Sequence, residues 1–254
     1  MSQFCILRLS ALGDCCHALS VVQRLKNEFP ESQITWIIGK TEHQLFKGMS
    51  GIEFIVIDKS KLLGSLLRCF LKLRKHRFDL LLNLHASASA NLASLCVRAK
   101  RKIGFDKKRA RDGQKWFCNE SIQAISNQHA AEGMMGFIKH LNIQDPLPRW
   151  QPLAIYPEEN QMKRYIDEEK RTCLISPCSS QRYGDKYNRS WSPNNFIEVI
   201  RYLSEKKGVQ IIITGGTSKI EKQYRKTFNS RDFGENVVNL IGETTIREMA
   251  SLIK

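Results

Sequence analysis

Short apolar runs alternate with longer amphipathic runs through the first 141 residues. The short runs have the length of buried strands, and the longer ones repeat apolar positions with helical spacing. Strands that alternate with helices predict βαβ units and a parallel sheet, hence an α/β fold. The predicted strands are Phe4–Leu9, Ile34–Ile38, Phe54–Ile57, Leu80–Leu84 and Ile103–Phe105, and the predicted helices are Asp14–Phe29, Glu42–Lys47, Lys61–His76, Ala86–Arg98 and His129–Leu141.

A proline-rich segment then interrupts the pattern. Pro146, Pro148, Pro152 and Pro157 fall within twelve residues, and proline disfavours both helix and sheet pairing. This composition predicts a linker. We therefore expect an N-terminal domain over residues 1–150 and a second domain over residues 151–254.

The alternation restarts after the linker. Strands are predicted at Thr172–Ser176, Val209–Thr214 and Val237–Ile241, and helices at Pro193–Lys206, Lys219–Phe228 and Thr244–Ile253. The last helix carries no stop signal, and a sheet of three strands would leave an edge strand unpaired. We therefore expect the second domain to be truncated, with further residues after Lys254.

The chain is strongly basic. Forty Lys and Arg against 25 Asp and Glu give a net charge of +15, which favours an anionic partner such as a nucleic acid, an anionic membrane surface or a phosphorylated substrate. The charges cluster at Lys72–Arg77, Arg98–Lys102 and Lys107–Arg111, with no RNA-binding signature beside them. A solvated basic surface would account for most of these residues.

The eight cysteines form no CxxC pair, so a zinc site is not indicated. The N-terminus lacks the pattern of a signal peptide, and no stretch reaches the 18 or so apolar residues of a membrane helix. These features predict a cytoplasmic protein with reduced thiols.

The most informative local feature is the segment Leu9–Asp14 between the first predicted strand and helix. In open α/β sheets, ligands bind where strands lead into helices. Gly13 is expected to allow a tight turn and to place Asp14 near the first helical turn. Asp14 is then either a ligand-facing carboxylate or a helix cap, since Asp is favoured as a cap. The segment matches neither GxGxxG nor a Walker loop, so neither a dinucleotide enzyme nor an ATPase is indicated.

The run Ile6–Asp14, with its Ser-x-x-Gly-Asp element, resembles the opening of glycosyltransferase family 9, the heptosyltransferases of the lipopolysaccharide inner core. Further matches span essentially the whole chain in order: Phe78–Leu84, Lys102–Asp106 with Arg109–Arg111, His129 at a helix start, Ser176–Ser180, Arg189–Pro193, and Gly215-Gly216 with Glu221. The chain departs from the family at His85, where Gln is common, and in the longer segment Gln181–Asn188. The family's Asp-Thr-Gly-x-x-His signature, which helps to hold the donor phosphates, is absent.

The resemblance implies a GT-B fold, in which two Rossmann-like domains face a cleft. It also implies an inverting, metal-independent and cofactor-free transfer of heptose from ADP-heptose to the Kdo/heptose inner core of lipopolysaccharide. Asp14 would be the general base. The residues implied for the donor are Ser179, Ser180, Arg189, Gly215, Gly216 and Glu221, although Glu221 is equally well placed to be a first-turn helix carboxylate.

The implied acceptor is Kdo-lipid A or an already heptosylated core, which is anionic. Ser10, Lys107, Arg109 and Arg111 are the candidate acceptor residues, because Arg pairs well with carboxylate and phosphate. The helix Lys61–His76 either faces anionic lipid or is an ordinary amphipathic core helix. The protein would then be peripheral at the cytoplasmic face of the inner membrane and would have no nucleic-acid partner.

Three other hypotheses remain open from the sequence. The first is another nucleotide-binding α/β enzyme, because fold alone does not determine function. The second is a basic nucleic-acid-binding module, which predicts steeply salt-dependent binding. The third is an inactive fragment that binds only the acceptor.

Overall fold

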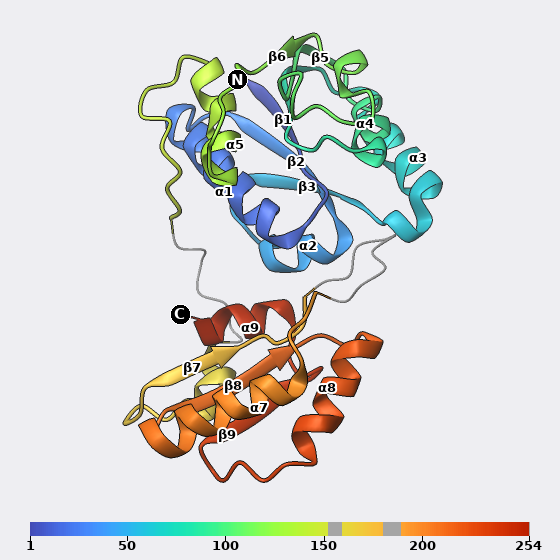
Figure 1. Cartoon of the computed structure of the whole chain (residues 1–254). Helices are drawn as coiled ribbons and strands as arrows, with labels where there is room; N and C mark the ends of the chain where they lie inside the picture. Colours follow the sequence, from blue (N-terminus) through green and yellow to red (C-terminus); the bar gives the residue numbers. More distant parts are fainter. Residues whose placement is uncertain (152–158, 180–188, 254) are drawn as a thin grey trace. The chain divides into compact units, whose positions relative to one another are not determined.

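The computed structural model describes residues 1–151, 159–179 and 189–253. The chain divides into two compact units, Met1–Ala154 and Ile155–Lys254. We call them unit 1 and unit 2 and describe each by itself (Figure 1). Part of the predicted linker and the segment Gln181–Asn188 lie outside the described residues.

Unit 1 is built on a parallel sheet with the strand order β3-β2-β1-β4-β5-β6. The strands are β1 (Gln3–Leu7), β2 (Gln33–Gly39), β3 (Ile52–Ile57), β4 (Phe78–Asn83), β5 (Ala99–Gly104) and the short β6 (Glu120–Ser121). Chain order runs outward from β1 in both directions, so the topology reverses between β1 and β4. In parallel sheets, ligands bind at the carboxyl edge of such a switch point.

Helices cover both faces of this sheet, which explains why its central strands β1, β2 and β4 are apolar on both sides (Figure 1). On one face, α3 (Leu62–Leu73) and α4 (Ala88–Ser94) bury Cys69, Leu73, Ala90 and Ala93 against β1 and β4. The helices α1 (Leu12–Glu28), α2 (Lys40–Phe46) and α5 (Ala130–His140) complete the unit. Trp36 of β2 is fully buried, and its ring lies 5.1 Å from that of Phe46 in α2.

Unit 2 has a parallel sheet of three described strands in the order β7-β8-β9. These are β7 (Thr172–Ile175), β8 (Gln210–Gly215) and β9 (Val237–Ile241). The helices α7 (Pro193–Arg201) and α8 (Lys219–Asn229) pack on one face, where Ile211 and Ile213 point. The helices α6 (Glu159–Met162) and α9 (Ile246–Ile253) border the other face, where Ile212 points. This alternation along β8 is the period-two pattern of a strand.

The predicted elements are confirmed, with differences at their ends. The strand predicted at Ile103–Phe105 begins earlier, at Ala99. The prediction missed its first half because that half contains the basic run Lys100–Lys102, near the sheet edge. The helix predicted over Ala86–Arg98 is shorter, at Ala88–Ser94, and Ser87 caps its start. The helix predicted over Pro193–Lys206 continues beyond α7 as a π-helical turn, Tyr202–Lys206. The short strand β6 has no apolar run to reveal it.

Candidate active site

Asp14 lies at the carboxyl edge of the unit 1 sheet, in the first turn of α1, which is the position that the sequence predicts. Its carboxylate forms an ion pair with the Arg8 guanidinium, and its Oδ2 atom also accepts a 3.2 Å hydrogen bond from the Ala11 backbone N–H. Asp14 therefore caps α1 and also presents a side chain that is 40% exposed. The capping alternative for this residue is confirmed, and the exposure of its side chain leaves the ligand-facing alternative a prediction.

Gly13 has a different role from the one predicted. It lies inside α1, and a Cβ atom built on it would meet nothing within 4 Å. The expected tight turn at Gly13 is therefore wrong: the chain turns before it, at Ala11, whose extended conformation begins the helix. The sequence could not distinguish the two because Gly is common both in turns and at helix starts.

Arg8 is the residue that organises this edge, and sequence reasoning assigned it no role. Its side chain is 10% exposed, and Nη1 donates a 2.6 Å hydrogen bond to the Leu84 carbonyl at the end of β4. Nη2 pairs with Asp14. Arg8, which follows β1, thus links the Asp14 carboxylate to the end of β4, so that both strands of the switch point help to position it. The one available signal was a charged residue interrupting an otherwise apolar strand.

His85, the departure from the family pattern, is also at this edge. Its Nδ1 accepts a 3.2 Å hydrogen bond from the Leu9 backbone N–H, so the ring proton of the neutral form sits on Nε2. Burial, together with the nearby charges of Arg8 and Lys59 and against the opposing effect of Asp14, lowers the pKa of the imidazole to about 3. His85 is therefore neutral at pH 7 and serves to hold the loop backbone.

Acid should destabilise unit 1 through His85. Its folded pKa of about 3 lies below the unfolded value near 6.5, so the unfolded chain binds one more proton between these pH values. Stability should therefore fall as the pH drops below about 6.5, by up to ~1.4 kcal/mol per pH unit from this group. His85→Gln keeps an acceptor for Leu9 and should flatten this part of the slope in urea unfolding between about pH 7 and 4.5. An unchanged slope would contradict the buried neutral histidine.

Two further charged groups, from different crossovers, complete the edge. Lys59 Nζ donates a 2.5 Å hydrogen bond to the Ser10 hydroxyl. Glu42, in α2, is half-buried, and burial raises the pKa of its carboxyl, although Lys59 and Arg8 oppose that shift. A carboxyl with a raised pKa in a charged cluster is a second candidate for acid–base chemistry. Neither Lys59 nor Glu42 belongs to a recognisable sequence motif, so sequence reasoning missed both.

The four predicted acceptor residues lie in three different places. Lys107 and Arg111 line a cavity of about 510 Å³ beyond the end of β5. Arg109, in contrast, pairs with the buried Asp106 and donates to the carbonyls of Gln123 and Gly133. Its guanidinium holds the loop together, which favours a structural role for it. Ser10 lies apart from this cavity, with Lys59.

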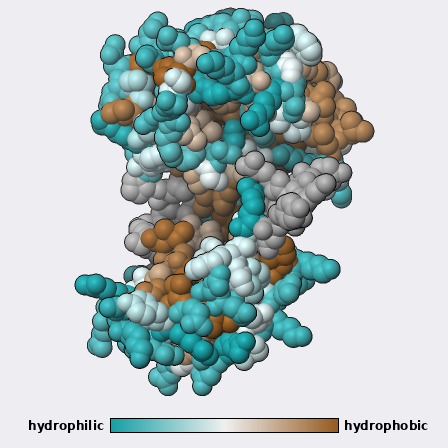
Figure 2. Space-filling view, viewed as in Figure 1, coloured by the Kyte–Doolittle hydropathy of each residue, from teal (hydrophilic) through white to brown (hydrophobic). Residues whose placement is uncertain are grey.

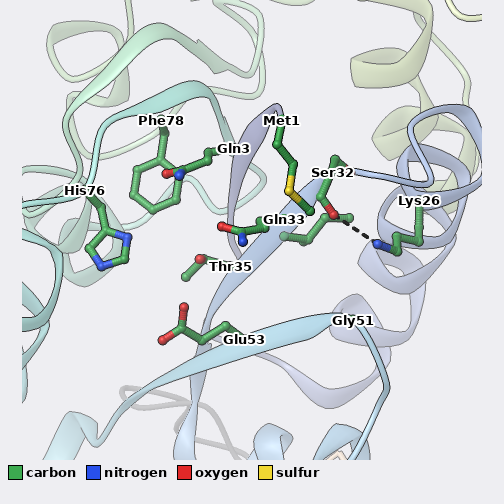
Figure 3. Close-up of a pocket in the computed structure, with 11 residues that line it drawn as sticks. Met1, Gln3, Lys26, Ser32, Gln33, Thr35, Gly51, Glu53, His76 and Phe78 are labelled. Atoms are coloured by element: carbon green, nitrogen blue, oxygen red, sulfur yellow. Dashed lines mark hydrogen bonds between the residues drawn. The ribbon is translucent and has the colours of Figure 1, made fainter.

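A different cavity of unit 1, of about 360 Å³, opens at the opposite edge of the sheet (Figure 3). Gln3, Gln33 and Phe78, which line it, are the first residues of β1, β2 and β4. In Figure 3, Lys26 is turned toward Ser32, to whose carbonyl it donates. Because this cavity is at the amino edge, it is separate from the cluster around Asp14.

Most of the candidate donor residues follow the carboxyl ends of strands in unit 2: Ser179 comes shortly after β7, and Gly215 and Gly216 lie at the end of β8. Ser176 and Thr214 join the ends of β7 and β8 through a 2.8 Å hydrogen bond between their hydroxyls. Ser179 N–H donates to the Ser190 hydroxyl at 2.8 Å, which brings these two residues together although they lie eleven positions apart. Arg189 is exposed beside Ser190. Ser180 lies outside the described residues.

Glu221 shapes the loop after β8. Its two carboxylate oxygens accept hydrogen bonds from the backbone N–H groups of Gly216, at 2.5 Å, and Ser218, at 2.9 Å, in a capping box that begins α8. A Cβ on Gly216 would lie 3.1 Å from this carboxylate, and one on Gly215 would lie 3.3 Å from Ile241. The glycine pair thus allows strand, loop and helix to approach one another closely.

Trp191 follows Ser190 in the chain. Its ring is half exposed and lies edge-on to Phe196, and its carbonyl accepts a 2.6 Å hydrogen bond from the Tyr224 hydroxyl. Pro193 is the first residue of α7, a position where its missing N–H costs nothing. The described residues of both units contain no group of three or more side chains suited to hold a metal ion.

Comparison with known proteins gives the family. The model of glycosyltransferase family 9 (heptosyltransferase) matches residues 66–254. The lipopolysaccharide core heptosyltransferase OpsX of Haemophilus influenzae is 33% identical over 250 residues, which is 98% of this chain and 70% of that protein.

Solved structures support the fold. The fold is similar to a family 9 glycosyl transferase of Veillonella parvula, with a TM-score of 0.79 and 16% identity over 98% of this chain and 72% of that one. It is also similar to Escherichia coli heptosyltransferase WaaC with ADP-2-deoxy-2-fluoro heptose, with a TM-score of 0.74 and 16% identity over 99% and 79% of the two chains. The chain therefore belongs to glycosyltransferase family 9, the heptosyltransferases, and its two parallel-sheet units are those of a GT-B fold.

Proposed function

We propose that this protein is an inverting glycosyltransferase that moves a heptose from ADP-heptose to the Kdo/heptose inner core of lipopolysaccharide. The family match and the names of its relatives, a lipopolysaccharide core heptosyltransferase and a heptosyltransferase solved with an ADP-heptose analogue, support the substrate class. The observation that carries the reaction is the Asp14 carboxylate, held through one oxygen at the switch point of unit 1.

Asp14 acts as the general base in this proposal. Oδ1 takes the proton of the acceptor hydroxyl as that oxygen attacks the anomeric carbon of the heptose. The bond from the anomeric carbon to the diphosphate oxygen breaks on the opposite face, so the configuration inverts and ADP leaves with the bonding electron pair. The ion pair with Arg8 fixes the carboxylate in place before the substrate arrives, and such positioning reduces the entropic cost of reaction.

Unit 2 binds the donor. The departing diphosphate gains negative charge and needs hydrogen-bond donors. The Ser179–Ser190 pair, the exposed Arg189 and the Gly215-Gly216 turn all lie at the carboxyl edge of one sheet, where nucleotides bind in this fold class. The N-terminus of α7, which begins at Pro193 just after Ser190 and Trp191, adds the positive end of a helix dipole, which favours an anion. Glu221 holds the glycine loop and, in this proposal, also faces the ribose.

The acceptor binds unit 1. Its Kdo carboxylates and sugar phosphates are anionic, and the cavity beyond β5 presents Lys107 and Arg111. Ser10 follows β1 and its partner Lys59 follows β3, so both lie on the same edge of the sheet as Asp14. The acceptor's lipid anchor places the reaction at an anionic membrane surface, with the protein peripheral to it.

The test is transfer by the full chain. ADP-heptose is incubated with Kdo-lipid A and, separately, with a heptosylated core, and mass spectrometry follows the addition of one heptose with release of ADP. We expect transfer to at least one acceptor, with no requirement for added metal. Preference for NAD or for UDP-sugars in parallel binding measurements would show another nucleotide enzyme. Acceptor binding without transfer would show a binding fragment and would contradict the proposal.

A further inference from the structure

The helix α3 exposes a stripe of large apolar side chains. Its inner face packs on the sheet through Ser65, Cys69 and Leu73. Leu63, Leu67, Phe70 and Leu71, at the spacing i, i+4, i+7 and i+8, form a second face that is exposed. A core helix is polar on its solvent side, so packing within unit 1 leaves this second face unexplained.

The neighbouring helix enlarges this surface. Leu92 in α4 and Leu95 just after it are exposed as well, and Cys96 Sγ donates to the Leu66 carbonyl of α3 at 3.5 Å, which places the two helices side by side. The six apolar side chains are between 42% and 82% exposed. Figure 2 shows brown surface on the flank of unit 1 where Figure 1 draws α3 and α4. Contiguous exposed apolar surface of this kind marks an interaction site.

The segment that carries the stripe has only positive charges. From Lys59 to Arg77 the chain has seven Lys and Arg and no Asp or Glu. Lys72 pairs with Glu53, while Arg74, Lys75 and Arg77 are exposed directly after the helix. An apolar stripe bordered by basic side chains is the composition of a helix that lies in the interface of an anionic bilayer. Two copies of the same surface would instead bring like charges together.

We propose that α3 and α4 form the face by which this protein docks on an anionic lipid bilayer, with the stripe inserted among the headgroups. The helix lies on the membrane: no described helix is both long and apolar enough to cross one. Basic residues beside the stripe are attracted to the anionic headgroups. The proposal deepens the proposed function, on which it rests only for the lipid anchor of the acceptor.

The position of this face suits such an acceptor. The 3-10 turn Lys59–Lys61 leads directly into α3, and Lys59 reaches the Ser10 hydroxyl at the edge that carries Asp14. The other helix begins just after His85 on the same edge, where Ala88 N–H donates to Asp112. Both helices therefore start at the candidate acceptor site. A sugar carried on a bilayer beneath them would lie close to Asp14.

The test is cosedimentation of the full chain with phosphatidylcholine vesicles, with and without phosphatidylglycerol. The variant is Leu63→Glu/Leu67→Glu, and the matched control is Tyr202→Glu/Ile253→Glu, which makes the same charge change on two exposed positions of unit 2. We expect the wild type and the control to bind anionic vesicles. The α3 variant should bind at least about tenfold more weakly, because insertion of the stripe is lost. Circular dichroism checks that all variants are folded.

A second readout separates this proposal from the proposed function. The α3 variant should keep transfer to a delipidated, soluble acceptor and lose it only with acceptor embedded in vesicles. Equal vesicle binding by variant and wild type, or no binding by the wild type, would overturn the docking face whatever the transfer activity. Self-association that the α3 variant abolishes, without vesicle binding, would assign the face to a second copy and would also overturn it.

Discussion

Asp14→Asn should lower turnover by roughly 10²–10⁴, while affinity for ADP-heptose stays within about twofold. The amide keeps the size of the side chain and still accepts the hydrogen bond from Ala11. It cannot accept the proton of the acceptor hydroxyl, so the loss falls on the chemical step. Single-turnover transfer isolates that step, and calorimetry with ADP-heptose measures binding.

Glu42→Gln is the matched control, because Glu42 is the other carboxyl close to Arg8 and Lys59. It is half-buried in α2, and its raised pKa makes it the rival candidate for the base. We expect Glu42→Gln to lose less than about tenfold in turnover, as for a residue that only shapes the site. If Glu42→Gln lost as much as we expect of Asp14→Asn, and Asp14→Asn little, the base would be Glu42.

The fold is readable from the sequence because burial on both faces of a parallel sheet leaves strong apolar runs. The strand predicted at Val237–Ile241 is confirmed to the residue, since polar residues bound it. The run Ala99–Lys102 escapes prediction, because basic side chains on a strand near the sheet edge look like a loop. The strand β6 has only two residues, Glu120–Ser121, which is too short to show an alternation of apolar and polar positions.

The candidate site can be predicted only partly from the sequence. Asp14 is the last residue of the Ser-x-x-Gly-Asp element, so its place in the first helical turn after β1 can be predicted. Its partner Arg8 cannot, because the contact depends on the pairing of β1 with β4 and on a side-chain conformation. Lys59 and Glu42 arrive through separate crossovers, and only the folded sheet brings them to one edge. For Arg109 the motif is misleading. It suggests contact with a ligand, whereas the guanidinium pairs with the buried Asp106 carboxylate and donates to the carbonyls of Gly133 and Gln123.

The second large effect is expected at Gly39, the last residue of β2. Its N–H donates a 3.0 Å hydrogen bond to the Leu9 carbonyl, and a Cβ atom on it would overlap that same oxygen. A backbone oxygen cannot move aside as the end of a side chain can. Gly39→Ala should therefore push β2 away from Leu9 and lower the free energy of unfolding by about 3 kcal/mol, from overpacking and a lost hydrogen bond.

The displaced Leu9 begins the loop that carries Ser10 and Asp14, so activity should fall as well. A shift of about 1 Å in a catalytic group can cost on the order of 100-fold in rate, and we expect a loss of about 10- to 100-fold in kcat/KM for Gly39→Ala. The matched comparison is Gly13→Ala, in the first turn of α1, where a new Cβ meets nothing within 4 Å. Both variants add one methyl group to the same edge of unit 1.

Gly13→Ala should leave the free energy of unfolding unchanged or raise it by up to about 1 kcal/mol, because Ala is the better helix former and its Cβ fits without contact. Urea unfolding of both variants measures the two free energies, and transfer assays measure kcat/KM. If Gly39→Ala were as stable and as active as Gly13→Ala, the close approach of β2 to Leu9 would not be what holds the Asp14 loop in place. A loss confined to Gly39→Ala would show that the position of the Asp14 carboxylate, the proposed base, depends on the packing of the neighbouring strand as much as on its own partners.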